Sequence, residues 1–127
     1  MTIIGALPHI FHHLMSQFFL PVMEDNQWSV YCINMIHKRI DILDSNAANH
    51  TVYHEELGDR IIPRLNSLFQ QVTNGGVKDF GTWRRPVRHL ADQACENDSG
   101  FFAVKFMELW NGDALITPVI PVSALNL

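Results

Sequence analysis

The stretch from Gln93 to Trp110 constrains the fold more than any other part of the chain, because it changes abruptly from polar to apolar. Residues 93–98 are polar and predict a loop. The residues after Gly100 predict a largely buried helix, since their apolar side chains are dense: Phe101, Phe102, Val104, Phe106, Met107 and Trp110. We expect Asp98 or Ser99 to cap this helix, because a short side-chain oxygen can accept a hydrogen bond from the free amides of the first turn.

Length and composition indicate one small folded domain. The chain has 127 residues, of which 47% are apolar, which is enough for a core and argues against disorder. The net charge is −4, and only Arg84, Arg85 and Arg88 cluster, so we expect neither a nucleic-acid nor a membrane partner. Cys32 and Cys95 have neither metal-ligand spacing nor the pattern of a disulfide framework, which favours a reducing compartment.

Hydrophobic periodicity predicts the order helix, strand, strand, strand, helix, short strand, helix. The predicted elements are a leading helix within 1–17, strands at 18–22, 28–35 and 40–43, a helix over 52–72, an extended segment within 83–90, the helix after Gly100 and an extended tail or edge strand over 115–122. We expect Pro63 to kink the long helix and residues 74–76 to end it. This order predicts an α+β fold whose sheet is antiparallel.

Three histidines in the first helix have a spacing that can gather a metal ion. His9, His12 and His13 fall at i, i+3 and i+4, on one side of a helix. No carboxylate or cysteine stands close to them in the sequence, so we favour the polar edge of the helix as their place. The sequence thus predicts no metal site and no cofactor.

Three short motifs follow one another along the chain: Gln27-Trp28 at the start of a strand, Asp44-Ser45 at the end of the next, and Gln93 six positions before Ser99 in Asp98-Ser99-Gly100. This arrangement resembles the ubiquitin-like-protein-specific cysteine proteases, the SUMO-protease or adenain-like family. Members of that family have His-Trp at the first place, Asp-Ser at the second, and a Gln six residues before the Cys of Asp-Cys-Gly at the third. Gln27 and Asp44 are seventeen positions apart, as the family's His and Asp typically are.

The resemblance extends over residues 18–112. Segments 36–45 and 106–112 look most like the plant branch of the family, which includes transposon-associated copies. The resemblance implies a papain-like or adenain-like cysteine-protease fold, with a small antiparallel or mixed sheet packed against helices. It also implies one domain over 1–127, made of the catalytic region 18–112, a reduced N-terminal part (the leading helix 1–17) and a tail at 113–127, in a protein of the nucleus or cytoplasm.

The family chemistry, carried over by position, is incomplete here. In the family the His is the general base for the Cys, the Asp orients the His, and the Gln donates to the oxyanion. Asp44 and Gln93 keep the last two roles, whereas Gln27 replaces the His and Ser99 replaces the Cys. A serine needs a positioned base to remove its proton, and an amide has no lone pair basic enough for this task. The resemblance therefore implies a ubiquitin-like-protein protease domain that is catalytically inactive.

Several alternatives stay open from the sequence. His50, His54 and His89 remain candidates for the missing imidazole, whereas Cys95 lies in the loop before the expected nucleophile position. Apart from the family, Asp44 is a turn aspartate and Gln93 a solvated loop residue. The chain is then an inactive protease, a binding module for a ubiquitin-like protein of the SUMO type or another partner, or a truncated relic.

Overall fold

The computed structural model of this chain describes residues 16–120. The expected leading helix, residues 1–17, lies outside this range except for its last two positions, and Gln17 already belongs to the first strand. The described elements run β1 (Gln17–Glu24), β2 (Gln27–Asn34), β3 (Arg39–Asp44), α2 (Thr51–Val72), β4 (Val87–His89), η1 (Glu96–Asp98) and α3 (Ser99–Leu109).

The first three strands form two consecutive antiparallel hairpins. Asp25 and Asn26 join β1 to β2 with φ angles of 53° and 59°, as the tight turns that match the twist of a hairpin require. β2 is buried along nearly its whole length between β1 and β3, so its prediction as a central strand is confirmed. β1 is a half-exposed edge strand rather than the buried strand that its apolar sequence predicts.

The fourth strand makes the sheet mixed, which corrects the antiparallel sheet predicted from the order of elements and agrees with the small antiparallel or mixed sheet that the resemblance implies. β4 pairs with β3 in parallel, with Ile42 opposite Val87 and Asp44 opposite His89, so the sheet is mixed and has the order β1-β2-β3-β4. The long connection through α2 explains this difference, because a parallel neighbour needs a crossover of a dozen or more residues, usually a helix. α2 itself has the predicted extent and continues through Pro63.

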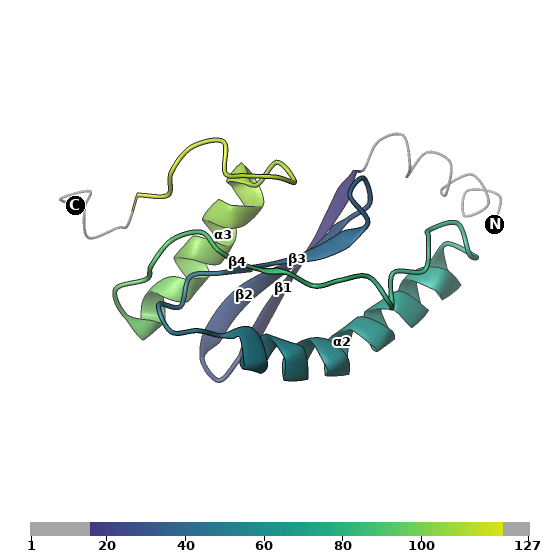
Figure 1. Cartoon of the computed structure of the whole chain (residues 1–127), viewed down its shortest axis with the longest axis horizontal. Coiled ribbons are helices and arrows are strands. Elements are labelled where there is room, and N and C mark those ends of the chain that lie inside the picture. Colours follow the sequence, from purple (N-terminus) through teal and green to yellow (C-terminus); the bar gives the residue numbers. More distant parts are fainter. Residues whose placement is uncertain (1–15, 121–127) are drawn as a thin grey trace.

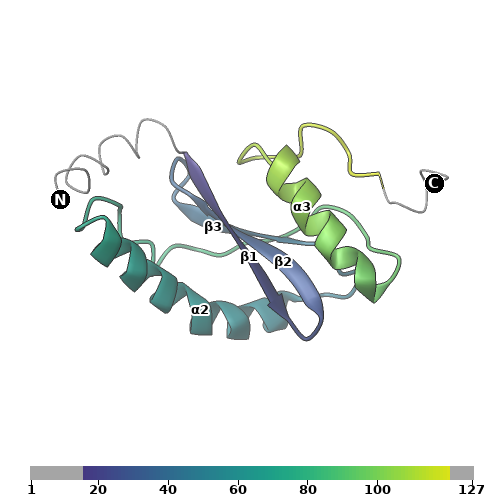
Figure 2. The ribbon, with the colours of Figure 1, turned by 180° about the vertical axis from the view of Figure 1, so that it is seen from behind.

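The sheet lies between the two long helices, with α2 on one face and α3 on the other (Figure 1 and Figure 2). Successive residues of a strand point to opposite faces, so β2 and β3 supply both halves of the core. The half that packs on α3 contains Val30, Cys32, Leu43, Phe102, Phe106 and Trp110. The half that packs on α2 contains Tyr31, Ile33, Ile40, Ile42, Leu57, Ile62 and Phe80.

The start of α3 differs from the predicted capped helix. Asp98 occupies the N-cap position, but its side chain makes no capping hydrogen bond, and its backbone is helical (φ −83°, ψ −14°). Residues 96–98 form a 3₁₀ turn, η1, that continues directly into α3. A side-chain cap needs an extended N-cap residue, and the turn removes that geometry.

The turn after α3 is tied to the sheet. The carbonyl of Gly112 accepts hydrogen bonds from Arg39 Nη2 at 2.6 Å and Asn34 Nδ2 at 3.0 Å. Of the predicted extended tail, the structure shows one isolated bridge between Trp110 and Leu115 and no strand over residues 116–120, whereas 121–122 lie outside the described range. Among the described helices, none has the length and apolar character that a membrane crossing requires.

Candidate functional site

Gln27 and Gln93, which are 66 positions apart in the sequence, lie side by side and hold each other through both amide groups. Gln27 Nε2 donates to Gln93 Oε1 at 3.0 Å, and Gln93 Nε2 donates back to Gln27 Oε1 at 3.1 Å. Ser45 anchors the loop of Gln93, since its carbonyl accepts from the Gln93 backbone N–H at 2.8 Å and its Oγ donates to Gln93 Oε1 at 2.6 Å. The amide at each of the two positions is therefore already engaged within the protein.

Ser99 is the first residue of α3 and is buried. Its Oγ accepts a hydrogen bond from the backbone N–H of Trp28 at 2.9 Å, so the hydroxyl joins the start of β2 to the start of α3. Within residues 16–120, no histidine or carboxylate shares a hydrogen bond with this oxygen. The geometry thus places Ser99 beside the Gln27-Trp28 motif, as the resemblance implies, but supplies no base for it.

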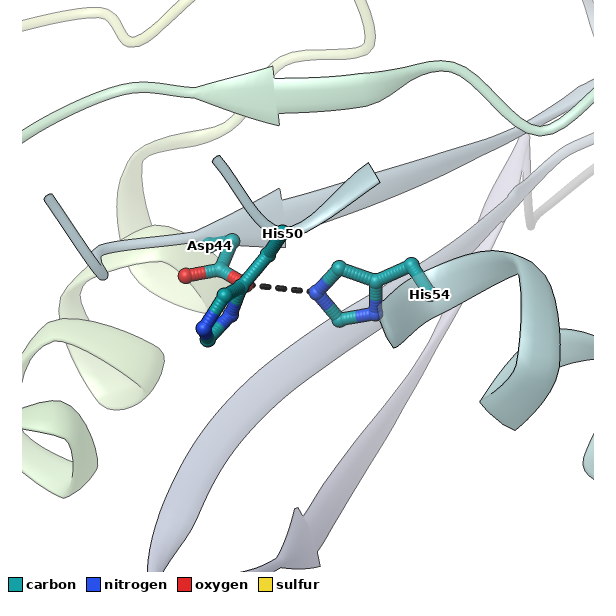
Figure 3. A group of neighbouring side chains, drawn as sticks. All are labelled: Asp44, His50 and His54. Carbon is teal, nitrogen blue, oxygen red and sulfur yellow. Dashed lines mark hydrogen bonds and ion pairs between the residues drawn. The ribbon is translucent and has the colours of Figure 1, made fainter. Parts of the chain in front are cut away.

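Asp44, the last residue of β3, shares no hydrogen bond with Gln27 within the described residues and binds side chains at the start of α2 instead. It lies two residues after Ile42 and on the same face of the strand, which is the face that α2 covers. Asp44 Oδ2 accepts from His54 Nε2 at 2.5 Å and from His50 Nδ1 at 2.9 Å (Figure 3), while Oδ1 accepts from the backbone N–H of Asn46 at 2.6 Å. Asp44 therefore orients two histidines, neither of which stands at the family's His position.

The surroundings of Asp44 favour its charged form. Burial by itself would raise the pKa of Asp44, but the hydrogen bonds from His54, from the Asn46 amide and from His50 outweigh this effect and hold the pKa below its usual value. Burial raises the pKa of Tyr31 well above its usual value, so its phenol stays protonated and donates to His54 Nδ1 at 2.9 Å. Both ring nitrogens of His54 are therefore occupied.

The remaining candidates for the missing catalytic groups are also engaged elsewhere. His89 pairs with Asp92 at 2.5 Å on the surface. Cys95 is exposed and precedes η1, and the neighbouring Asp98 raises the pKa of its thiol through a hydrogen bond and its negative charge. The structure thus brings Gln27, Gln93 and Ser99 close together, whereas the hydrogen bonds of the Asp44 side chain run to His50, His54 and Asn46.

The sequence interpretation missed that His50 and His54 are the partners of Asp44. It left both histidines open only as replacements for the base. Their spacing at i and i+4 across the start of α2, six and ten positions after Asp44, is the signal that could have indicated a shared site.

Two neighbouring cavities open beside Ser99 and share Trp28 and Gly100 in their walls. The first cavity, of about 350 Å³, is also lined by Met23, Asn26, Asn97 and Ser99. The second, of about 360 Å³, is lined mainly by apolar side chains: Pro21, Ala103, Val104 and Met107. Trp28, which is 39% exposed, stands between them, so the region around Ser99 is a cleft with an apolar extension.

Comparison with known proteins gives this arrangement a family. Residues 15–114 match the sequence profile of the Ulp1 protease family, C-terminal catalytic domain, so the chain belongs to this family. The match confirms the resemblance to the SUMO-protease family that the three motifs indicate. A search of the curated proteins found no match.

Two solved structures are similar to this chain. The SUMO protease Ulp1 with its catalytic cysteine oxidised to a sulfenic acid has a TM-score of 0.58 and 14% identity, over 86% of this chain and 47% of that one. The Chaetomium thermophilum Ulp1-like SUMO protease catalytic domain has a TM-score of 0.47 and 16% identity, over 80% of this chain and 41% of that one. The chain thus spans less than half of each of these structures. The likeness to the first one confirms the predicted α+β cysteine-protease fold.

Proposed function

We propose that this chain is a Ulp1-type protease domain without peptidase activity. The observation that carries the proposal is the hydrogen bond from the Trp28 N–H to Ser99 Oγ, with a glutamine rather than a base at position 27. A serine hydroxyl attacks a carbonyl only when a base takes its proton during the attack. In the wild type Asp44 orients His50 and His54 rather than a group at position 27.

Gln93, the expected oxyanion donor, also has both of its side-chain N–H bonds already engaged. The two N–H bonds of the Gln93 side chain point at Gln27 Oε1 at 3.1 Å and at the Cys95 carbonyl at 3.4 Å. A donor that stabilises an oxyanion must be free to face it when charge develops, and losing one such donor costs about 100- to 1,000-fold in rate. Loss of a triad's nucleophile and base removes most of the remaining acceleration.

The direct test is cleavage of ubiquitin-like precursors, including SUMO-type ones, by the purified chain. We expect no cleavage by the wild type and a gain in the Gln27→His/Ser99→Cys double variant, with Gln27→His alone as the matched control. Circular dichroism verifies that each variant is folded. Wild-type cleavage that disappears in Ser99→Ala would show that the serine is a working nucleophile and would overturn the proposal. Failure of the folded double variant would remove support for these positions as the family's His and Cys.

A second candidate function is non-catalytic binding of a ubiquitin-like protein, and the cleft at Trp28 favours it. An extended peptide can occupy such a cleft through backbone contacts and side-chain pockets, with no nucleophile involved. The family suggests a SUMO-type partner. The adjoining cavities around Trp28 and Gly100 support this function because together they form a continuous path lined partly by apolar groups.

Titration of isotope-labelled ubiquitin and SUMO-type proteins with the chain tests this second function. We expect shifts confined to the C-terminal tail of the partner and its adjoining face. Trp28→Ala should abolish these shifts, whereas Val52→Ala, which removes an exposed apolar side chain on α2, should preserve them. If none of the labelled proteins shows a shift although the chain is folded, the binding function is contradicted. The relic interpretation, in contrast, predicts a missing or broad thermal unfolding transition.

Three finer assignments rest on sequence alone. Segments 36–45 and 106–112 support a place in the plant, transposon-associated branch of the family, which a tree of family sequences can test. The family also suggests the nucleus or cytoplasm as the compartment. We retain one domain over 1–127, with 18–112 as its catalytic region, as a proposal that limited proteolysis can test.

A further inference from the structure

We propose that Asp44, His50 and His54 form a binding site for one transition-metal ion, with zinc the best match to the ligand set. The three side chains come from the end of β3 and the start of α2 and point toward one another (Figure 3). His50 Nδ1, His54 Nε2 and a carboxylate oxygen of Asp44 all lie within 4.8 Å of one another. Two imidazoles and one carboxylate are a common set of three protein ligands for zinc.

The present spacing needs only small movements to accept the ion. Ligand atoms about 2.0–2.1 Å from a tetrahedral zinc stand roughly 3.3 Å apart. His54 Nε2 and His50 Nδ1 are 2.5 and 2.9 Å from Asp44 Oδ2, so each of these two pairs must open by less than about 1 Å. The two histidine nitrogens, which are at most 4.8 Å apart, must approach each other by up to about 1.5 Å. Rotation of His50, whose side chain is 18% exposed, supplies the movement of this ligand.

The outer contacts hold the ligands in place. Asp44 Oδ1 is fixed by the Asn46 N–H at 2.6 Å, which leaves Oδ2 as the oxygen that faces the histidines. Tyr31 Oη lies 2.9 Å from His54 Nδ1, the ring nitrogen that does not face Asp44. Metal-binding histidines usually have such a partner on the second nitrogen, which fixes the ring and its tautomer.

Metal binding fixes where the protons of this network stand. A metal ion takes the lone pair of a neutral imidazole, so any proton on His54 Nε2 or His50 Nδ1 leaves those atoms for the other ring nitrogen or for solvent. His54 then carries its proton on Nδ1, where Tyr31 Oη accepts it, and the Asp44 carboxylate supplies the negative charge.

An ion can reach the site from solvent. Asp44 and His50 line a cavity of about 180 Å³ whose other walls include Asn46, Asn49 and His89, and water there can fill the fourth ligand position. The nearby cation Arg85 lines a second cavity on the other side of His54 and pairs with Asp59 at 2.6 Å, which reduces its repulsion of a metal ion. The start of α2 also carries a partial positive charge, which the Asp44 carboxylate offsets.

The same three residues can also serve as a hydrogen-bond network that only holds β3 to α2, so the test must detect the metal itself. The full chain is used with His9, His12 and His13 replaced by glutamine, because their spacing can bind metal independently. Cobalt(II) replaces zinc as a spectroscopic probe, and its visible absorption reports tetrahedral coordination with nitrogen ligands. Zinc competition and calorimetry give the stoichiometry and the affinity.

We expect one equivalent of cobalt, displaced by zinc, and a rise in melting temperature with added zinc. His50→Ala should abolish the cobalt spectrum, and this half-buried position tolerates the change better than the buried His54. Tyr31→Phe should weaken zinc binding by about 10- to 100-fold, as loss of an outer contact does. His37→Ala, a change of a surface histidine in the turn between β2 and β3, should leave binding intact. No cobalt spectrum in the parent protein, or an unchanged spectrum in folded His50→Ala, would overturn the proposal.

Discussion

At the scale of single residues, Ser99 has a structural use that does not depend on catalysis. Its Oγ accepts the Trp28 N–H at 2.9 Å, and the side chain is buried. We expect Ser99→Ala to lower the free energy of unfolding by about 1–3 kcal/mol, because the Trp28 N–H loses its partner in a shielded place. Urea denaturation measures this loss. Ser67→Ala, on the exposed side of α2, is the control, with an expected change within about 0.5 kcal/mol; equal losses for the two variants would contradict this role.

The two cysteines should differ sharply in reactivity. Cys32 is fully buried in the core against α3, and burial raises the pKa of its thiol to about 12. Cys95 is exposed, so a thiol reagent reaches it although Asp98 raises the pKa of its thiol. We expect one accessible thiol in the native protein and two after unfolding, counted with a chromogenic disulfide reagent. Cys95→Ser should remove the native signal; two fast thiols in the native wild type would show that the core around Cys32 is open.

At the scale of elements, the buried Asp41 of β3 is the centre of a hydrogen-bonded network that connects the sheet to the turn after α3. Asp41 is fully buried and accepts from Arg39 Nε at 2.8 Å and Arg88 Nε at 3.1 Å. Arg39 also donates to the Gly112 carbonyl at 2.6 Å. The network thus joins β3, the strand β4 that contains Arg88, and the turn after α3.

Removing this carboxylate should therefore be costly. We expect Asp41→Ala to lower the free energy of unfolding by about 3–5 kcal/mol, since it removes the buried carboxylate that pairs most closely with Arg39 and leaves only the longer pair with the exposed Asp113. Asp59→Ala is the matched control, because Asp59 pairs with Arg85 on the surface and such pairs contribute about 1 kcal/mol or less. Chemical denaturation of the two variants gives the comparison. A loss for Asp41→Ala as small as that for Asp59→Ala would mean that the network contributes little.

At the scale of the whole molecule, β2 and β3 belong to both halves of the core. Val30, Cys32 and Leu43 pack towards α3, whereas Tyr31, Ile33, Ile40 and Ile42 pack towards α2. Since neither helix can keep its packing once these two strands separate, we expect a single cooperative unfolding transition. Near-ultraviolet and far-ultraviolet circular dichroism should give coincident melting curves. Two separate transitions would show that α2 and α3 unfold independently.

Much of the fold follows from local pattern. The strand at 28–35 and the helix at 52–72 were predicted nearly at their observed bounds, because their apolar periodicity is long and regular. The parallel pairing of β4 was not predicted, since three residues carry no signal for the direction of their neighbour. The cap of α3 was predicted wrongly, because the preceding residues continue the helical path as η1.

The sequence alone determined the family and the order of most elements, because motif spacing and periodicity along the chain record them directly. That Gln27 and Ser99 stand at the family's His and Cys positions stays a prediction from the same spacing. Only the tertiary structure decided what the remaining polar residues bind. Gln27 pairs with Gln93, and Asp44 with His50 and His54, since strand alternation and the crossover helix select which side chains meet. Contacts between residues far apart in sequence depend on the packing of whole elements, and local periodicity contains no information about them.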